Sequence, residues 1–352
     1  MKKHAWTLCR ICSAALTVAL TLLVAACNVH EWPADEPDPG PGPGPEPDPE
    51  TPAFVLHLNF DTEIPLHREI AWTRGAADPH DVRYQVMIYQ GAGEITSSSV
   101  PMRTLTLTGA SSTLNRDIEI DLDEGLYSFL IWADYVDQGS TGDKYYSTGT
   151  LSSITLKDRN NHSGSNPYRD AFRGQTTGSV TKGAGGSATA QMKRPMGRFE
   201  FITTDLEEFV DRAAAAKAAS EGSPAEDSRA DMGGYKVTFV YTGFMPSTYN
   251  IYTDKPTDAW TGMKFDSKFE PTNDGTRMGY DYIMVNGSET MVNVAVIVSD
   301  ERGNVIASTP TIDVPIVRSK LTVVKGEFMS SNSGGGVVIN PGFDGEYNIE
   351  IR

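Results

Sequence analysis

Short segments in which apolar and polar residues alternate recur through most of this chain, and they limit what it can fold into. Residues 54–60 (FVLHLNF) place four apolar side chains on one face of an extended strand. Further strand-like segments lie at residues 82–90, 118–122, 127–132, 147–156, 196–202, 235–241, 292–299, 311–317, 321–328 and 347–351. Strands of this length and spacing, with almost no helical period between them, predict a mainly β protein built from β-sandwiches.

The length of the chain indicates more than one folded unit. Its 352 residues exceed a small single domain, and its 39% hydrophobic content is enough for globular cores. We expect a first β-sandwich over residues 53–193 and a second over residues 194–352.

One helix is expected inside the second unit. Thr204 and Glu207 match a capping box, in which the threonine caps the helix and the glutamate lies three residues on. The following residues are rich in alanine and place Leu206, Phe209 and Val210 on one stripe. The sequence therefore predicts a short helix over residues 205–219, packed on the edge of a sheet.

The first residues predict export. Residues 1–26 have a basic start and an uncharged apolar stretch over residues 11–26, which is short for a membrane span. This signal peptide closes on residues 24–27 (VAAC), where small side chains precede Cys27 as bacterial lipoprotein processing requires. We expect cleavage before Cys27 and acylation of that residue, with several acyl chains giving stable anchoring. An ordinary signal peptide with a chance cysteine is the alternative.

A proline-rich linker completes residues 27–52. From residue 37 to residue 49 every second position is proline, and the residues between are Asp, Gly and Glu. Proline fixes φ and removes hydrogen-bond donors, so we expect a semi-rigid polyproline II spacer that reaches roughly 75 Å. Such a spacer holds a folded domain clear of the membrane.

Charge and cysteine content exclude several classes of function. The formal net charge is −16, which disfavours binding to nucleic acid or to anionic lipid through charge. Of the three cysteines, Cys9 and Cys12 lie in the signal peptide, so Cys27 alone remains. We expect no disulfide and no thiol chemistry in the mature protein.

Three loops are candidates for ligand binding. Asp134, Asp137 and Asp143 are candidate calcium ligands, but their spacing is not that of an EF-hand, and solvated turns are favoured. Residues 158–172 hold polar and aromatic residues that suit either a sugar or a long connection. Residues 249–260 are unusually aromatic for a loop. Candidate sugar-stacking residues there are Tyr249, Tyr252 and Trp260, and the alternative is that they anchor the loop to a sheet.

No catalytic set is present in the sequence. The histidines of the mature chain form no zinc pattern, and no G-x-S-x-G motif occurs. The glycine run at residues 334–336 lacks the lysine of a phosphate-binding loop. Carboxylates are plentiful, so a pair that acts as in a glycosidase stays an open alternative. We predict a protein without enzymatic activity, metal or cofactor.

Several stretches of the mature chain resemble the fimbrillin-like lipoproteins of Bacteroidota, relatives of the FimA-type and Mfa-type fimbrial subunits and anchors. The stretches are residues 27–33 (CNVHEWP), 125–134 (GLYSFLIWAD), 168–174 (YRDAFRG), 194–201 (RPMGRFEF), 243–246 (GFMP) and 340–345 (NPGFDG). The resemblance implies two tandem transthyretin-like β-sandwiches. It also implies attachment to the outer membrane through acylated Cys27, surface exposure, and a role in fimbriae or adhesion.

The resemblance also implies a way of joining subunits. Polymerising fimbrillins are cut after an arginine in the N-terminal domain, which frees a groove for a neighbour's strand. The corresponding candidate here is Arg74, within residues 72–75 (WTRG). An uncut protein keeps its lipid and acts as an anchor, tip or accessory subunit, and other fimbrial subunits are the expected partners. A surface glycan-binding lipoprotein is the alternative function.

Overall fold

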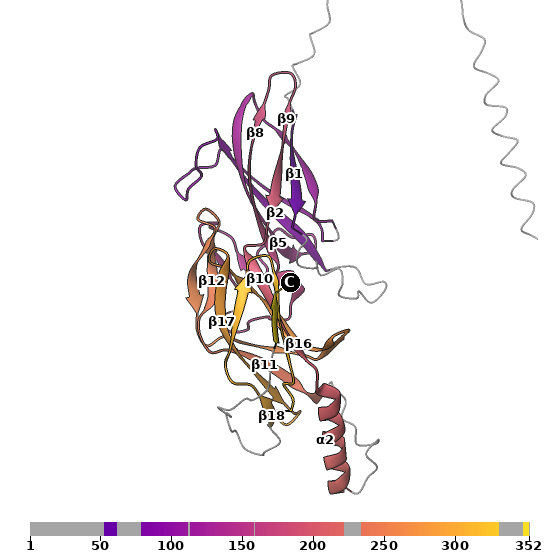
Figure 1. Ribbon diagram of the computed structural model, residues 1–352. Coiled ribbons are helices and arrows are strands. Elements are labelled where there is room, and N and C mark those ends of the chain that lie inside the picture. The colour runs from indigo at the N-terminus through magenta and orange to yellow at the C-terminus, as the bar shows by residue number, and fades with distance from the viewer. Residues whose placement is uncertain are drawn as a thin grey trace, which may run out of the picture. The chain divides into compact units, whose positions relative to one another are not determined.

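The computed structural model describes residues 53–61, 79–111, 113–157, 159–221, 234–330 and 348–351 (Figure 1). Residues 49–352 form one compact unit, to which all the described residues belong. This unit is mainly β, as the sequence predicts, and its described residues hold one α-helix and one short 3-10 helix.

The N-terminal part is a sandwich of two sheets. The strands of the three-stranded sheet are, in order, β4 (Arg116–Asp121), β1 (Ala53–Phe60) and β9 (Gly186–Met192). Those of the facing four-stranded sheet are β3 (Arg103–Ala110), β2 (His80–Gln90), β5 (Gly125–Asp137) and β8 (Ala171–Val180). The two sheets enclose a core that draws all its residues from positions 54 to 192.

Three more sheets complete the described structure. The first has the order β15 (Glu270–Thr272), β16 (Gly275–Met284), β10 (Met196–Thr203), β20 (Leu321–Gly326) and β21 (Asn348–Ile351). The second contains β14 (Lys264–Ser267), β11 (Lys236–Tyr241), β17 (Glu289–Ser299), β18 (Val305–Ser308) and β19 (Ile312–Val317). The third contains β13 (Lys255–Trp260), β12 (Met245–Asn250), β7 (Ile154–Leu156) and β6 (Tyr146–Ser147).

The third sheet joins strands from both halves of the sequence, because β7 pairs with β12 through Thr155 and Thr248. The second core is shared in the same way. It takes in Leu130 and Trp132 from β5 together with side chains from β10 to β20. The sequence-based domain boundary at residues 193/194 falls between β9 and β10 and stays a prediction.

Burial on both faces explains the composition of β5. Its residues are buried from Tyr127 to Val136 without interruption. Phe129 and Ile131 face the first core, whereas Leu130 and Trp132 face the second. A strand that is covered on both faces has no solvent-facing positions, so residues 129–133 (FLIWA) are a continuous apolar run and do not alternate.

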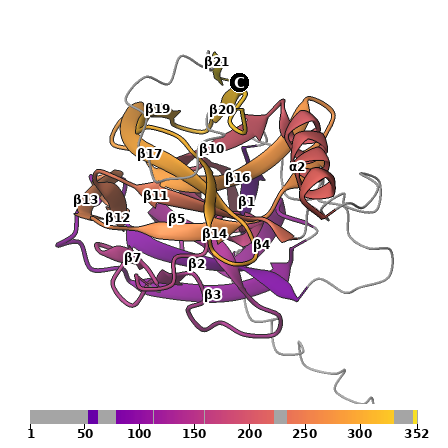
Figure 2. The same cartoon turned by 90° about the horizontal axis from the view of Figure 1, so that it is seen from below.

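The helix α2 (Leu206–Glu221) lies close to its predicted place, outside the stacked strands (Figure 2). The predicted capping box is wrong. Thr204 still follows β10, and its N–H donates to the carbonyl of Gly326 at 3.0 Å. The residue directly before the helix is Asp205, whose backbone carbonyl accepts the N–H of Phe209. Among the described residues, no helix has the length and apolarity that crossing a membrane needs.

The carboxylate of Asp205 ties the start of α2 to residues 329–330, which follow β20. It accepts the hydroxyl of Thr203 at 2.6 Å and the N–H of Met329 at 3.2 Å, and it is buried. Replacing Asp205 by alanine should therefore lower the free energy of unfolding by about 1–3 kcal/mol. Thr204→Ala is the control, and we expect a change within about 0.5 kcal/mol because the side chain is exposed. Urea unfolding of both variants would contradict this assignment if Thr204→Ala proved the costlier change.

Candidate functional site

Strand β1 occupies the middle of its sheet. It pairs antiparallel with β4 on one edge and parallel with β9 on the other. The next strand in the sequence, β2, belongs to the opposite sheet, so residues 62–78 are the covalent link from β1 to the sandwich that follows. We call the slot between β4 and β9 the β1 site.

The side chains of β1 fill the first core as the sequence predicts. Phe54, Leu56, Leu58 and Phe60 are between 0 and 5% exposed. Phe54 stacks on Phe129 with ring centroids 5.0 Å apart. These four residues are the floor contacts of the β1 site.

The energy of these contacts decides what can happen at the site. Full burial of one large apolar side chain stabilises a fold by about 1.5–3 kcal/mol, so four contribute roughly 6–12 kcal/mol. That is comparable with the whole stability of a typical domain. An empty β1 site would therefore not persist, and a strand that leaves it must be replaced by another.

A buried arginine holds the end of β1. The guanidinium of Arg194 is 0% exposed and donates to both carboxylate oxygens of Asp170 at 2.8–2.9 Å. Its Nη1 also donates to the backbone carbonyl of Asp61 at 3.1 Å. The carbonyl of Arg194 in turn accepts Nε of Arg318 at 3.1 Å. One residue thus connects the end of β1 to the β19–β20 turn.

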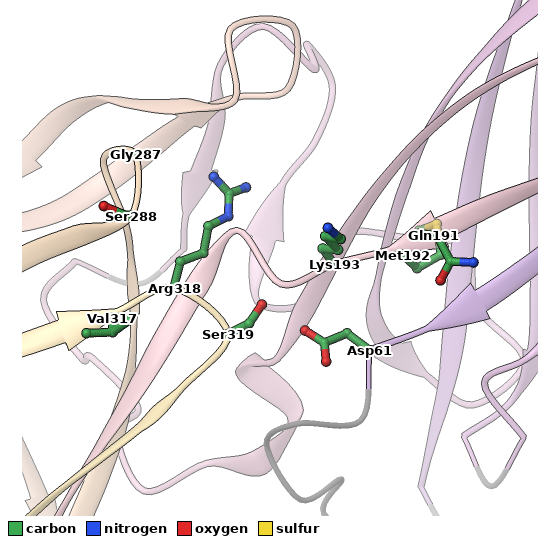
Figure 3. Close-up of a pocket in the computed structure, with 9 residues that line it drawn as sticks. All are labelled: Asp61, Gln191, Met192, Lys193, Gly287, Ser288, Val317, Arg318 and Ser319. Atoms are coloured by element: carbon green, nitrogen blue, oxygen red, sulfur yellow. The ribbon is translucent and has the colours of Figure 1, made fainter. Parts of the chain in front are cut away.

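A pocket lies beside this contact (Figure 3). Its volume is about 540 Å³. The lining residues are Asp61, Gln191, Met192, Lys193, Gly287, Ser288, Val317, Arg318 and Ser319. The pocket therefore opens where β1 and β9 end.

Asp281 of β16 forms the centre of a buried polar cluster. Its carboxylate accepts the hydroxyl of Tyr241 at 2.6 Å and the N–H of Tyr282 at 2.8 Å, and it contacts Nη1 of Arg169. Nε2 of His162 lies 2.6 Å from Oδ2. Burial alone raises the pKa of Asp281, but the charge of Arg169 and the hydrogen bonds to the carboxylate outweigh it and leave this pKa below its ordinary value.

This cluster removes His162 from the sugar alternative for the 158–172 segment. His162 is 7% exposed and Arg169, in the 3-10 helix η2 (Pro167–Arg169), is 2% exposed. Both side chains turn inward because the Asp281 carboxylate needs donors in a buried setting. The two side chains therefore stabilise the buried cluster around Asp281, and His162 is not presented to a ligand.

The aspartates considered for calcium binding are occupied otherwise. Asp134 is buried within β5, and both its oxygens pair with Arg83 at 2.7–2.9 Å. Asp143 accepts Nη1 of Arg83 at 2.8 Å, and Asp137 pairs with Lys144 at 2.9 Å. Within the described residues, no group of three or more His, Cys, Asp or Glu could hold a metal ion. The favoured interpretation as solvated turns is wrong for Asp134, which is 0% exposed inside β5.

The aromatic segment at residues 249–260 is a β-hairpin of β12 and β13 and not a loop. Tyr249 is 0% exposed and its hydroxyl donates to Asp254, so its interpretation as a surface stacking residue is wrong. Tyr252 and Trp260 are partly buried against the second core, and Arg159 lies over the Trp260 ring at 5.7 Å. Sugar stacking stays a prediction for Tyr252 and Trp260 only.

Two of the predicted sites, Cys27 and Arg74, lie outside the described residues, so acylation and cleavage stay predictions. Sequence reasoning missed Arg194 and Asp281. The second left a signal, because an acidic residue within the aromatic run of β16 (GYDYIM) must find buried donors.

Comparisons with solved structures give distant likenesses to bacterial surface proteins. A candidate cell adhesion protein from Bacteroides eggerthii is 12% identical, with a TM-score of 0.43, over 86% of this chain and 95% of that chain. A candidate polysaccharide binding protein from Bacteroides thetaiotaomicron is 12% identical, with a TM-score of 0.41, over 73% and 79%. The fimbrial anchor protein Mfa2 from Porphyromonas gingivalis is 10% identical, with a TM-score of 0.36, over 85% and 97%.

These neighbours are of the classes that the fimbrillin-like resemblance names. The comparison with curated proteins finds no match. A family model described as a family of unknown function, DUF6562, matches residues 50–352. Because this match covers most of the chain, the protein belongs to the DUF6562 family.

Proposed function

We propose that this protein is a fimbrillin-like structural subunit of the cell surface, with an adhesive and not a catalytic role. It is delivered as a lipoprotein acylated at Cys27, and the linker of residues 28–52 holds the sandwiches away from the outer membrane. Its partners are other fimbrial subunits, which join it by exchanging a strand at the β1 site.

The central position of β1 is the observation that supports this proposal. Strand β1 pairs on both edges and contributes four buried side chains. If β1 departs, the slot that remains is matched to another extended segment. Backbone pairing supplies affinity in such strand addition, and the floor contacts of alternate side chains supply specificity. The β1 site therefore supplies the place where the strand of a partner subunit would insert.

The sequence position of Arg74 fits this use of β1. Residue 74 falls after the end of β1 at Phe60 and before β2 at His80. A cut there separates β1 and the lipid-bearing Cys27 from the sandwiches in one step. An uncut chain keeps both, and it then serves as an anchor or accessory subunit.

The mature N-terminus of protein purified from cells tests the proposal. Mass spectrometry that finds residue 75 first supports a cut, polymerising subunit. An acylated Cys27 in the fimbrial fraction supports an anchor. If the protein is absent from every fimbrial fraction, the proposed role as a fimbrial subunit is wrong.

A further inference from the structure

The N-terminal sandwich is closed on one side and open on the other. The β8–β9 hairpin joins the two sheets on the closed side, where Thr181 bridges to Gly185 and Arg173 bridges to Lys193. On the open side the two sheets end in β3 and β4. Within the described part of the chain, β3 pairs with β2 alone, and its outer edge has no strand beside it (Figure 2). Backbone groups on that edge are therefore available to a further strand.

The contact made by Arg116 shows which residues of β3 face the open edge. Its Nη1 donates to the backbone carbonyl of Thr108 at 2.6 Å, so this carbonyl points away from β2. Backbone groups along an antiparallel strand point alternately toward the partner strand and away from it. Thr104 and Thr106 therefore also direct their N–H and C=O groups to the open edge.

The sequence of β3 lacks the protection that edge strands usually carry. Natural edge strands are short, or they hold charges or proline that hinder pairing with another strand. Other described edges follow this rule, since β4 carries three acidic residues, β13 contains Pro256 and β15 contains Pro271. Strand β3 (RTLTLTGA) is eight residues long, and Arg103 at its start is its only charged residue. This edge is therefore suited to accept a strand.

The surroundings of this edge define the strand that fits it. Leu105 and Leu107 are partly buried against the first core, so apolar side chains on an added strand would extend that core. Arginines mark both ends of the open stretch, with Arg103 at its start and Arg116 at Thr108. Each donates to a backbone carbonyl, which leaves its positive charge unneutralised. Carboxylates at the two ends of the added strand would complement these charges.

A second copy of this chain is a poor occupant of the edge. Pairing of two β3 strands about Thr106 would set Arg103 of each copy opposite Gly109 of the other. A side chain at Gly109 would place its Cβ 2.6 Å from Nη1 of Arg116, so this pairing brings two arginines together. Like charges that oppose one another across a strand pair are destabilising. The net charge of −16 on each chain adds to the repulsion.

From these observations we propose that the free edge of β3 is a docking site for an extended segment of a partner protein. The segment pairs through its backbone with Thr104, Thr106 and Thr108, presents apolar side chains beside Leu105 and Leu107, and carries a carboxylate at each end. It adds antiparallel, as the other strand pairs of this sheet do. Because β1 belongs to the facing sheet, this inference does not depend on strand exchange at the β1 site.

Peptide binding to the full mature chain tests this inference. The probe is an N-terminally fluorescent, C-terminally amidated peptide of sequence ETVTVTE, whose valines would lie beside Leu105 and Leu107. A second peptide, KTVTVTK, keeps the strand-forming centre and reverses the end charges. Binding is followed by fluorescence anisotropy. The main variant is Thr106→Pro, which removes an outward N–H and leaves the hydrogen bonds to β2 in place.

We expect ETVTVTE to bind about tenfold more tightly than KTVTVTK, because two exposed charge pairs change from attractive to repulsive. Arg103→Gln should reduce this preference. Arg302→Gln, at an exposed position in the turn before β18, should leave it unchanged. Thr106→Pro should weaken the binding of both peptides about tenfold or more, while the protein still unfolds cooperatively.

Three results would overturn the inference: no binding of either peptide, equal binding of both, or undiminished binding to folded Thr106→Pro protein. Sedimentation of the unmodified chain tests the other occupant. A dimer that forms with rising concentration and is lost in Thr106→Pro would make a second copy the occupant, and it would overturn the assignment of an acidic partner segment. None of these results bears on strand exchange at the β1 site.

Discussion

Replacing Asp281 by alanine should lower the free energy of unfolding by about 3–5 kcal/mol, because the change leaves Arg169 buried beside His162 without its carboxylate. Urea unfolding followed by tryptophan fluorescence would measure the loss. Asp121→Ala, at an exposed position on β4, is the matched control, and we expect a change within about 0.5 kcal/mol. Equal effects of the two substitutions would contradict the role assigned to the Asp281 cluster.

The same cluster predicts how stability depends on pH. Burial and the charge of Arg169 lower the pKa of His162, so the folded protein keeps this ring neutral. The unfolded chain takes up a proton as the pH falls below about 6.5, and stability should decline from there until the folded-state pKa is passed. Asp281 has a lowered pKa, so its contribution persists above about pH 4 and is lost only in stronger acid. His162→Gln should flatten the decline that begins below about pH 6.5.

Replacing Leu56 by alanine should cost about 2–5 kcal/mol, because the side chain is fully buried at the centre of β1 and leaves a cavity. Val55→Ala, one residue away on the other face of the strand, is the control and should cost about 1 kcal/mol or less. The loss falls on the contacts that keep β1 in its slot. Leu56→Ala should therefore also speed the exchange of β1 for an added peptide of residues 53–61, measured in a chain that has been cut within residues 62–78.

The two parts of this prediction can fail separately. Similar destabilisation by Leu56→Ala and Val55→Ala would contradict the assignment of the floor contacts. A destabilised Leu56→Ala protein whose β1 exchanges no faster would show that β1 leaves only when the whole sandwich unfolds.

Alternating strands were the part of the fold that the sequence predicted best. The face formed by Phe54, Leu56, Leu58 and Phe60 is confirmed, since a period of two reports directly which side chains enter a core. Strand β8 was not predicted because it contains two glycines. A side chain at Gly174 would place its Cβ 2.3 Å from Sδ of Met192, so packing against β9 requires glycine there.

The candidate site could be predicted only in part, because its contacts join residues far apart in the sequence. The run around Asp281 shows that a buried acid needs donors, but nothing in it names His162, 119 positions away. The prediction for residues 249–260 was wrong for a related reason. Their aromatic side chains suggested an exposed loop, whereas β12 pairs with β7 and the side chain of Tyr249 packs in the second core.

Strand exchange at the β1 site is the central claim, and a disulfide that locks β1 in place tests it most directly. His57 of β1 lies opposite Asp117 of β4, and their side chains meet at 2.7 Å on the exposed face. Opposed residues of antiparallel strands have Cα atoms about 4.5–5.5 Å apart, within the range that a disulfide spans. The described part of the chain has no native cysteine to interfere.

The measurement is the fraction of His57→Cys/Asp117→Cys protein that enters high-molecular-weight fimbrial assemblies in its own cells. We expect the oxidised double variant to reach the cell surface and remain outside these assemblies. Each single variant, and the double variant kept reduced, should assemble as the unaltered protein does. Assembly of the locked protein at the normal level would show that β1 never leaves its slot, and it would contradict strand exchange at this site.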